Sequence, residues 1–164
     1  MAPQNVAFGI IAAAMVVSAL RVVTTRNVVH SALYLVVVLA GAGGLYVLLA
    51  AEFVAWAQVL IYVGAILVLL LFGIMLTRAP LRESAELDTD QRWAGAVVAL
   101  GLLGLLVALL SDTFGRVKVE PVAAVSGEAV GESIFRVFVI PFEVVSMLLL
   151  AALVGAVVLA RRDD

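Results

Sequence analysis

The sequence predicts an all-α polytopic membrane protein with about five transmembrane helices. Of its 164 residues, 65% are hydrophobic and only 13% are charged, whereas soluble domains are about 45–50% apolar and about 25% charged. The apolar residues form long runs, which a core of this size could not bury on every side. We therefore expect residues 1–164 to form a single membrane domain that the bilayer covers. The expected helices lie at about 6–23, 28–51, 53–77, 93–110 and 137–160.

The first two apolar runs differ in length and in their content of small residues. Residues 6–23 have about the minimum length that crosses a hydrocarbon core roughly 30 Å thick. The chain starts without the Lys or Arg that opens a secretory signal peptide, so we keep this run as a first membrane helix. The second run contains Gly41, Gly43 and Gly44 in its middle. We expect these glycines to let another helix approach closely.

Polar segments of different length separate the later runs. Only Glu52 stands between the second and third runs, which predicts a tight hairpin with this carboxylate at the membrane edge. Residues 78–92 mix acidic and basic side chains and are expected to form a solvated loop. Residues 111–136 carry charges among small residues and are long enough to include a short surface helix or hairpin. Two arginines, Arg161 and Arg162, end the fifth run.

The distribution of basic residues predicts the orientation in the membrane. With five spans, seven Lys and Arg residues would share one side and three the other. Cytoplasmic loops carry the excess of positive charge, so the loop 78–92 is expected in the cytoplasm and the segment 111–136 outside it. The N-terminus would then lie outside and the C-terminus inside. The larger group comprises Arg21, Arg26, Arg78, Arg82, Arg92, Arg161 and Arg162, and the smaller group comprises Arg116, Lys118 and Arg136.

Few residues in this chain could support catalysis or bind a cofactor. There is no cysteine, and His30 is the single histidine, so we expect neither a metal site nor a redox centre. His30 fits an interfacial or hydrogen-bonded residue better than a ligand or proton relay. No nucleotide-binding loop occurs, and a net charge of −2 without a basic stripe argues against nucleic acid as a partner.

Two carboxylates could act at or inside the membrane. Glu143 lies in the fifth run, where a charge is costly unless it is paired or neutral, and such residues usually serve function. Alternatively, Glu143 reaches the interface or caps a helix start distorted by Pro141. Glu52 lies closer to the membrane edge, and a simple loop carboxylate is the favoured interpretation there.

The third run carries polar and small residues in an otherwise apolar sequence. Gln58 and Tyr62 are four residues apart and would share a helical face, with Gly64 adjacent. One interpretation is interhelical hydrogen bonding with close packing at Gly64. The other is a local helix distortion, because wide helical turns are rare and concentrate at functional sites. Composition alone favours the first interpretation.

The third run and two further segments resemble a known family. Residues 51–77 have the sequence AEFVAWAQVLIYVGAILVLLLFGIMLT, residues 27–33 have NVVHSAL, and residues 131–162 include Pro141-Phe-Glu143. This combination is similar to the J subunit of bacterial respiratory complex I, NADH-quinone oxidoreductase, whose mitochondrial counterpart is NADH dehydrogenase subunit six. The resemblance covers essentially all five spans.

The resemblance implies a multi-pass subunit of the bacterial cytoplasmic membrane, without a redox centre and not catalytic alone. FMN, iron–sulfur clusters and quinone would be held by the partners, which are other membrane and peripheral subunits. In the family, the third helix changes between a regular helix and a π-bulge near the element that corresponds here to Tyr62, Val63 and Gly64. The implied role is to couple quinone reduction to proton translocation. A transporter component and a membrane scaffold without a coupling role are the competing hypotheses.

Overall fold

The structure is a computed structural model that describes residues 2–76, 92–115 and 125–161. These ranges are helical and contain no strand. Five helical segments are long and apolar enough to cross a membrane, which confirms the predicted fold class. These spans are Pro3–Thr24, Val28–Leu48, Glu52–Leu76, Trp93–Phe114 and Val139–Ala160.

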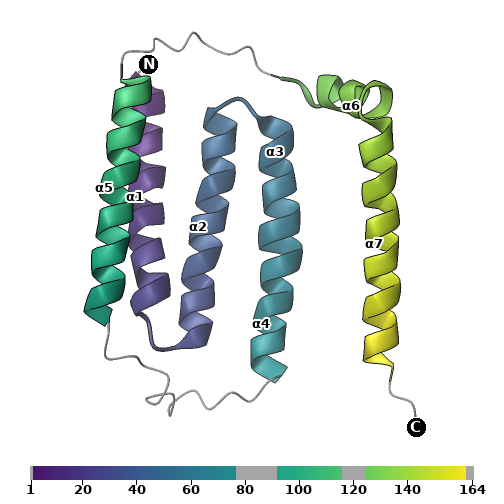
Figure 1. The fold of residues 1–164 in the computed structure, drawn as a ribbon, viewed down its shortest axis with the longest axis horizontal. Helices are drawn as coiled ribbons and strands as arrows, with labels where there is room; N and C mark the ends of the chain where they lie inside the picture. Colours follow the sequence, from purple (N-terminus) through teal and green to yellow (C-terminus); the bar gives the residue numbers. More distant parts are fainter. Residues whose placement is uncertain (1, 77–91, 116–124, 162–164) are drawn as a thin grey trace.

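The first two helices, α1 (Ala2–Thr24) and α2 (Val28–Leu48), form an antiparallel pair (Figure 1). The short connection is held by side chains. Asn27 is the N-cap of α2, and its Oδ1 accepts hydrogen bonds from the backbone N–H groups of the second and third helical residues at 3.0 and 3.3 Å. The Ser31 hydroxyl donates to the carbonyl of Val22 at 2.6 Å. These bonds fix the direction in which α2 leaves the turn.

The third span follows after a tight turn and is not uniform. It consists of α3 (Glu52–Ala57), a π-helical segment η1 (Gln58–Ile66) and α4 (Leu67–Leu76). Together they form one rod that runs antiparallel to α2 (Figure 1). The expected hairpin is therefore present, although α2 ends at Leu48 and not at the expected residue 51.

The turn between α2 and α3 contains a residue with positive φ. The N–H of Ala51 donates to the carbonyl of Tyr46 at 2.9 Å, and the N–H of Ala50 donates to the carbonyl of Val47 at 3.0 Å. This is the Schellman pattern that ends many helices. Glycine usually occupies the left-handed position of this motif, but here Ala50 adopts φ 56°. The tight hairpin is thus formed at a steric cost.

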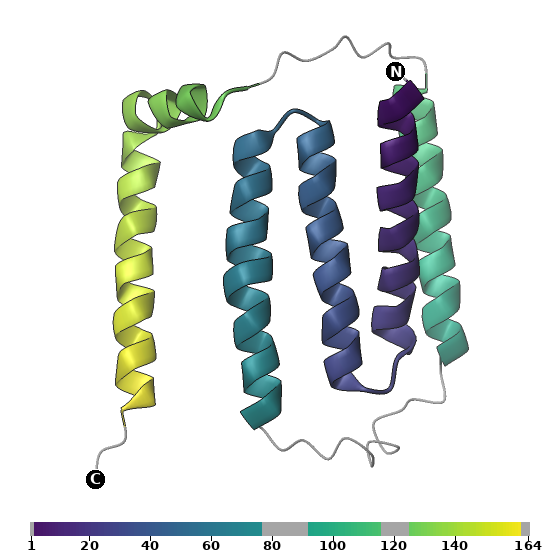
Figure 2. The same cartoon turned by 180° about the vertical axis from the view of Figure 1, so that it is seen from behind.

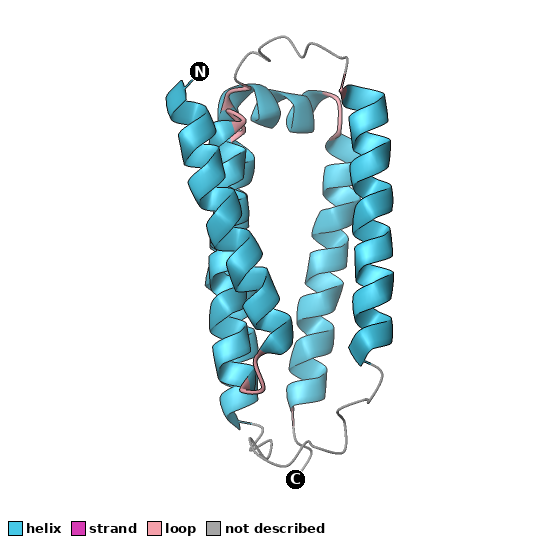
Figure 3. Ribbon diagram, turned by 90° about the vertical axis from the view of Figure 1, so that its left-hand side faces the viewer, coloured by secondary structure: helices cyan, strands magenta, loops and turns pink. Residues whose placement is uncertain are grey.

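The remaining helices stand apart from this group. α5 (Arg92–Phe114) contacts no other helix of the described residues, and α7 (Val139–Ala160) contacts only α6 (Gly127–Arg136). Figure 2, seen from behind, and Figure 3, seen from the side, both show α6 lying across the ends of the spans. The segment 111–136 thus contains the end of α5 and a short surface helix, one of the two forms expected for it.

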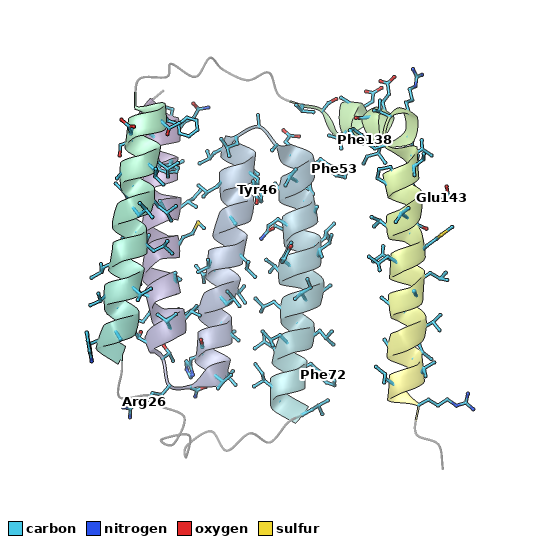
Figure 4. All side chains as sticks on the ribbon, viewed as in Figure 1. Arg26, Tyr46, Phe53, Phe72, Phe138 and Glu143 are labelled. Carbon is cyan, nitrogen blue, oxygen red and sulfur yellow. The ribbon has the colours of Figure 1, made fainter. Side chains whose placement is uncertain are left out.

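Basic residues at the helix ends fall into two groups in space. Arg21 lies in the last turn of α1 and Arg26 lies in the connection to α2, and Arg161 follows α7 at the same end of the molecule (Figure 4). Arg136 lies at the opposite end, in the last turn of α6, and forms an exposed ion pair with Glu132 at 3.1 Å. The predicted grouping of these four residues follows from the helix directions. Arg78, Arg82, Arg116, Lys118 and Arg162 lie outside the described residues.

Candidate functional site

The candidate site is the π-helical segment η1, Gln58–Ile66, in the middle of the third span. At its end the N–H of Leu67 donates to the carbonyl of Tyr62, five residues earlier, where a regular α-helix would use the carbonyl four residues earlier. The segment contains Gln58, Tyr62, Val63 and Gly64, the residues singled out from the sequence. The hydrogen-bond ladder of this span is therefore distorted where its polar and small residues lie.

The start of η1 is fixed against α2. The Gln58 side-chain amide donates to the carbonyl of Leu39 at 3.4 Å, and Gln58 is half-buried. Gly43 of α2 is buried, and a Cβ placed on it would lie 3.2 Å from Cγ2 of Val59 and 3.8 Å from Cγ of Gln58. Ala55, one turn before Gln58, is only 5% exposed. A side-chain hydrogen bond and close packing thus act at the same point.

The glycines of α2 serve two neighbouring helices. Gly43 faces the third span, whereas Gly41 and Gly44 face α1. A Cβ on Gly41 would collide with the side chain of Met15, and a Cβ on Gly44 would lie 3.2 Å from Cδ1 of Ile11. The expectation that this cluster permits close helix approach is therefore met on both sides of α2.

The middle of η1 has fewer contacts within the chain. Tyr62 is 48% exposed, and among the described residues its hydroxyl has no hydrogen-bond partner. Val63 is half-buried and Gly64 is exposed. A Cβ on Gly64 would meet only the Val59 carbonyl oxygen, at 3.4 Å. The structure thus places the close packing with the facing helix at Gly43 and not at Gly64.

The residue that follows η1, Leu67, is again buried at the interface with α2. Leu67 is the most buried large residue of the described chain, at 2% exposure, whereas the preceding Ile66 is 51% exposed. The two residues are neighbours and point in directions about 100° apart on a helix. Which of them faces α2 therefore depends on the number of residues in the preceding turns.

The two candidate carboxylates lie near the same end of the molecule. Glu52 is exposed in the first turn of α3. Glu143 is exposed near the α6 end of α7, as Figure 4 shows. Pro141 occupies the first turn of α7, where the missing N–H removes no helical hydrogen bond. In residues 2–76, 92–115 and 125–161 neither carboxylate has an ion pair or hydrogen bond.

The described residues do not gather into a metal site. Within them, no three His, Asp or Glu side chains lie close enough to hold a metal ion. His30 is exposed in the first turn of α2, where its backbone N–H bonds to Asn27.

The family resemblance indicated a π-bulge near Tyr62, Val63 and Gly64, whereas sequence reasoning did not identify the residues of α2 that contact η1. The carbonyl of Leu39 cannot be recognised as an acceptor from sequence, because every residue of α2 has a carbonyl. The Gly43–Val59 contact was detectable only in part, since the glycine cluster predicts a close approach without naming the facing residue. These contacts depend on which helices pack together and on how each helix is rotated about its own axis.

Comparison with known proteins extends over nearly the whole chain. The family described as NADH-ubiquinone/plastoquinone oxidoreductase chain 6 matches residues 18–159. NAD(P)H-quinone oxidoreductase chain 6 of Leptolyngbya boryana is 45% identical over 98% of this chain and 81% of its own length. The chloroplastic NAD(P)H-quinone oxidoreductase subunit 6 of Nephroselmis olivacea is 39% identical over 98% of this chain and 94% of its own. F(420)H(2) dehydrogenase subunit J of Methanosarcina mazei is 35% identical, with coverage of 98% and 92%. The chain is therefore a member of the NADH-ubiquinone/plastoquinone oxidoreductase chain 6 family.

Proposed function

We propose that this chain couples quinone reduction to proton translocation in the membrane arm of an NADH-quinone oxidoreductase. The observation that carries the proposal is the π-helical segment η1, held at its start by Gln58 and Gly43 of α2. The chain would lie in a bacterial cytoplasmic membrane. Other membrane and peripheral subunits would bind FMN, iron–sulfur clusters and the quinone.

The names of the relatives support a role away from the electron donor. Two relatives are named NAD(P)H-quinone oxidoreductase subunits, and another is named a subunit of an F(420)H(2) dehydrogenase. The electron donors in these names differ, yet the membrane chains are similar in sequence. This similarity is expected if the chain acts at a step after oxidation of the donor.

The geometry suggests how η1 could act as a switch. If η1 became a regular α-helix while Gln58 stayed bound to Leu39, the part after η1 would rotate by about 100°, the angle of one helical residue. Leu67 would leave the α2 interface, and Ile66 would take its place. The exchange needs a small free-energy difference, since about 1–3 kcal/mol changes a two-state population by roughly 5–150-fold.

Such a rearrangement would also change the polarity of the membrane interior. Backbone N–H and C=O groups in hydrocarbon need hydrogen-bond partners. During a change from the π pattern to the α pattern, groups that have lost their partner in one pattern must bind water, side chains or neighbouring backbone. Tyr62 is 48% exposed and lies in this segment, and its hydroxyl could bind such a water. We propose that the π form and the α form differ in the hydrated path that they offer to protons between this chain and its neighbours.

Deletion of Val63 tests the proposal. A π turn contains one residue more than an α turn, so removing Val63 allows a regular helix that keeps Leu67 facing α2. The complex should assemble, but the segment can no longer alternate between two ladders. We expect loss of the proton gradient in vesicles that receive NADH and quinone.

The matched control is Gly64→Ala, which keeps the chain length and adds a Cβ at an ordinary contact distance of 3.4 Å from the Val59 carbonyl oxygen. This variant should retain pumping. Normal turnover and pumping in a fully assembled Val63 deletion would contradict the switch and favour a scaffold role. A transporter role without redox partners would instead be indicated if the purified assembly lacked flavin and iron–sulfur absorbance.

A further inference from the structure

α7 carries a single charged side chain in a span that is otherwise free of charge. Its residues Val139–Ala160 include Glu143 and no other acidic residue, lysine, arginine or histidine. The 22 residues of α7 make it about 33 Å long, close to the hydrocarbon core of about 30 Å. Glu143 is the fifth of these residues, so its Cα lies about 6 Å inside the span. A carboxylate at this depth has to be paired, to be neutral or to reach the interface.

Within the described residues, no basic side chain pairs with Glu143. α7 contacts only α6 among the described helices. Arg136 of α6 already forms an ion pair with Glu132 at 3.1 Å. Arg161 lies at the opposite end of α7, and Arg26 lies at that end of the molecule too (Figure 4). A cation that neutralises Glu143 therefore has to come from outside this part of the chain.

Glu143 does not cap the start of α7 either. The N-cap residue Phe138 has no side-chain cap hydrogen bond, and the first turn of α7 contains no acidic residue. The stabilising effect of a helix N-terminus on a negative charge is confined to that first turn. Among the described residues, the Glu143 carboxylate accepts no hydrogen bond. The helix itself thus leaves the charge uncompensated.

The face of α7 that carries Glu143 is open. Ile140 lies three residues before it and Met147 four residues after it, so the three side chains share one face. Ile140 is 75% exposed and Met147 is 64% exposed. This face therefore presents one negative charge between two large apolar side chains. A partner that matches it needs one cation with apolar surface on either side.

We propose that Glu143 is the recognition point for a basic side chain, Lys or Arg, of another subunit. A carboxylate and a cation that meet away from water form a charge-assisted hydrogen bond. The long apolar stem of Lys or Arg packs on neighbours such as Ile140 and Met147 while its charged head reaches the carboxylate. The proposal rests on the proposed function only in that the chain assembles with other subunits. It does not require η1 to switch.

Charge variants of Glu143 in the native complex provide the first test. Glu143→Gln imitates the neutral carboxyl group, and Glu143→Lys would bring two cations together. Native electrophoresis of solubilised membranes measures the assembled fraction. We expect this fraction to fall in Glu143→Gln and to be lost almost completely in Glu143→Lys. Full assembly of Glu143→Gln would overturn the ion pair, because a neutral group would then be sufficient. Full assembly of Glu143→Lys would overturn it as well, because a side chain that merely reaches the interface tolerates either sign of charge.

Photocrosslinking supplies a second test that leaves Glu143 intact. A benzophenone amino acid would replace Met147, on the same face of α7. Val145 is the matched control position, since it is 51% exposed and lies about 200° around the helix from Glu143. We expect the Met147 position to crosslink to a segment of another subunit that contains a Lys or Arg, and the Val145 position not to reach that segment.

A charge exchange then completes the experiment. Replacing the basic residue of the crosslinked segment by Glu should restore assembly of the Glu143→Lys complex. Crosslinks from the Met147 position only to phospholipid, to this same chain or to a segment without Lys or Arg would overturn the proposal, as would a charge exchange that restores nothing. A Val63 deletion that pumps normally would contradict the switch but would not alter these results.

Discussion

Replacing Gly43 by Val should weaken the packing between α2 and η1. The new Cβ would lie 3.2 Å from Cγ2 of Val59, and the two added methyl groups need further space. Overpacking of this kind costs about 1–3 kcal/mol. The neighbouring Gln58–Leu39 hydrogen bond is already 3.4 Å long, so any outward movement of η1 would break it. We therefore expect the variant to lose the anchor at the start of the switch segment.

The assay is the fraction of the complex that survives heating, measured by native electrophoresis of solubilised membranes. Gly43→Val should lower the temperature at which the complex dissociates and should reduce the proton gradient per NADH oxidised. Gly9→Val in α1 is the matched control, because a Cβ there meets no described atom within 4 Å. If both variants behaved like the unmodified complex, the close contact at Gly43 would not support the segment and the anchoring argument would be refuted.

Four further predictions address single residues. Gln58→Leu should weaken the α2–η1 interface by about 0.6–2 kcal/mol and lower coupling at unchanged assembly, measured as the proton gradient per NADH; unchanged coupling would remove Gln58 from the mechanism. Glu143→Gln should assemble better than Glu143→Leu, because the amide keeps hydrogen-bonding capacity, and equal yields on native gels would reject this. Ala50→Gly should raise the thermal stability of the complex by about 0.5–1 kcal/mol, since glycine adopts positive φ without strain; a lower melting temperature would show that the turn is not strained. In intact cells, an impermeant thiol reagent should label Arg136→Cys and spare Arg26→Cys, and the reverse pattern would invert the topology.

The number and approximate positions of the spans follow from the sequence because a membrane places a strong demand on length and polarity. A run of about 20 apolar residues has few alternatives to a spanning helix. The ends of the helices differ from the predicted ones: α1 already begins at Ala2, and α5 continues past the expected residue 110 to Phe114. Polar residues such as Ser111 and Asp112 suggest a loop, yet they can extend a helix into the interface. The short surface helix α6 was one of two forms expected, because charges and small residues alone do not determine backbone conformation.

The candidate site was predictable in location but not in contacts. Gln58, Tyr62 and Gly64 stand out in an apolar run, and the family resemblance pointed to a π-bulge near Tyr62. The structure adds that the distortion begins at Gln58 and that the anchor includes Gly43. Sequence spacing placed Gln58 and Tyr62 on one face, but Gln58 contacts α2 while Tyr62 stays half-exposed. Contacts of this kind depend on the relative rotation of two helices, which a single sequence does not specify.

The hydrogen bond of the Leu67 N–H tests the central claim most directly. Structures of the assembled complex at rest and during turnover with NADH and quinone would show which carbonyl accepts it. The account predicts the Tyr62 carbonyl with Leu67 buried against α2 in one state, and the Val63 carbonyl with Ile66 in that position in the other. A bond to Tyr62 and a buried Leu67 in both states would contradict the claim that this segment switches.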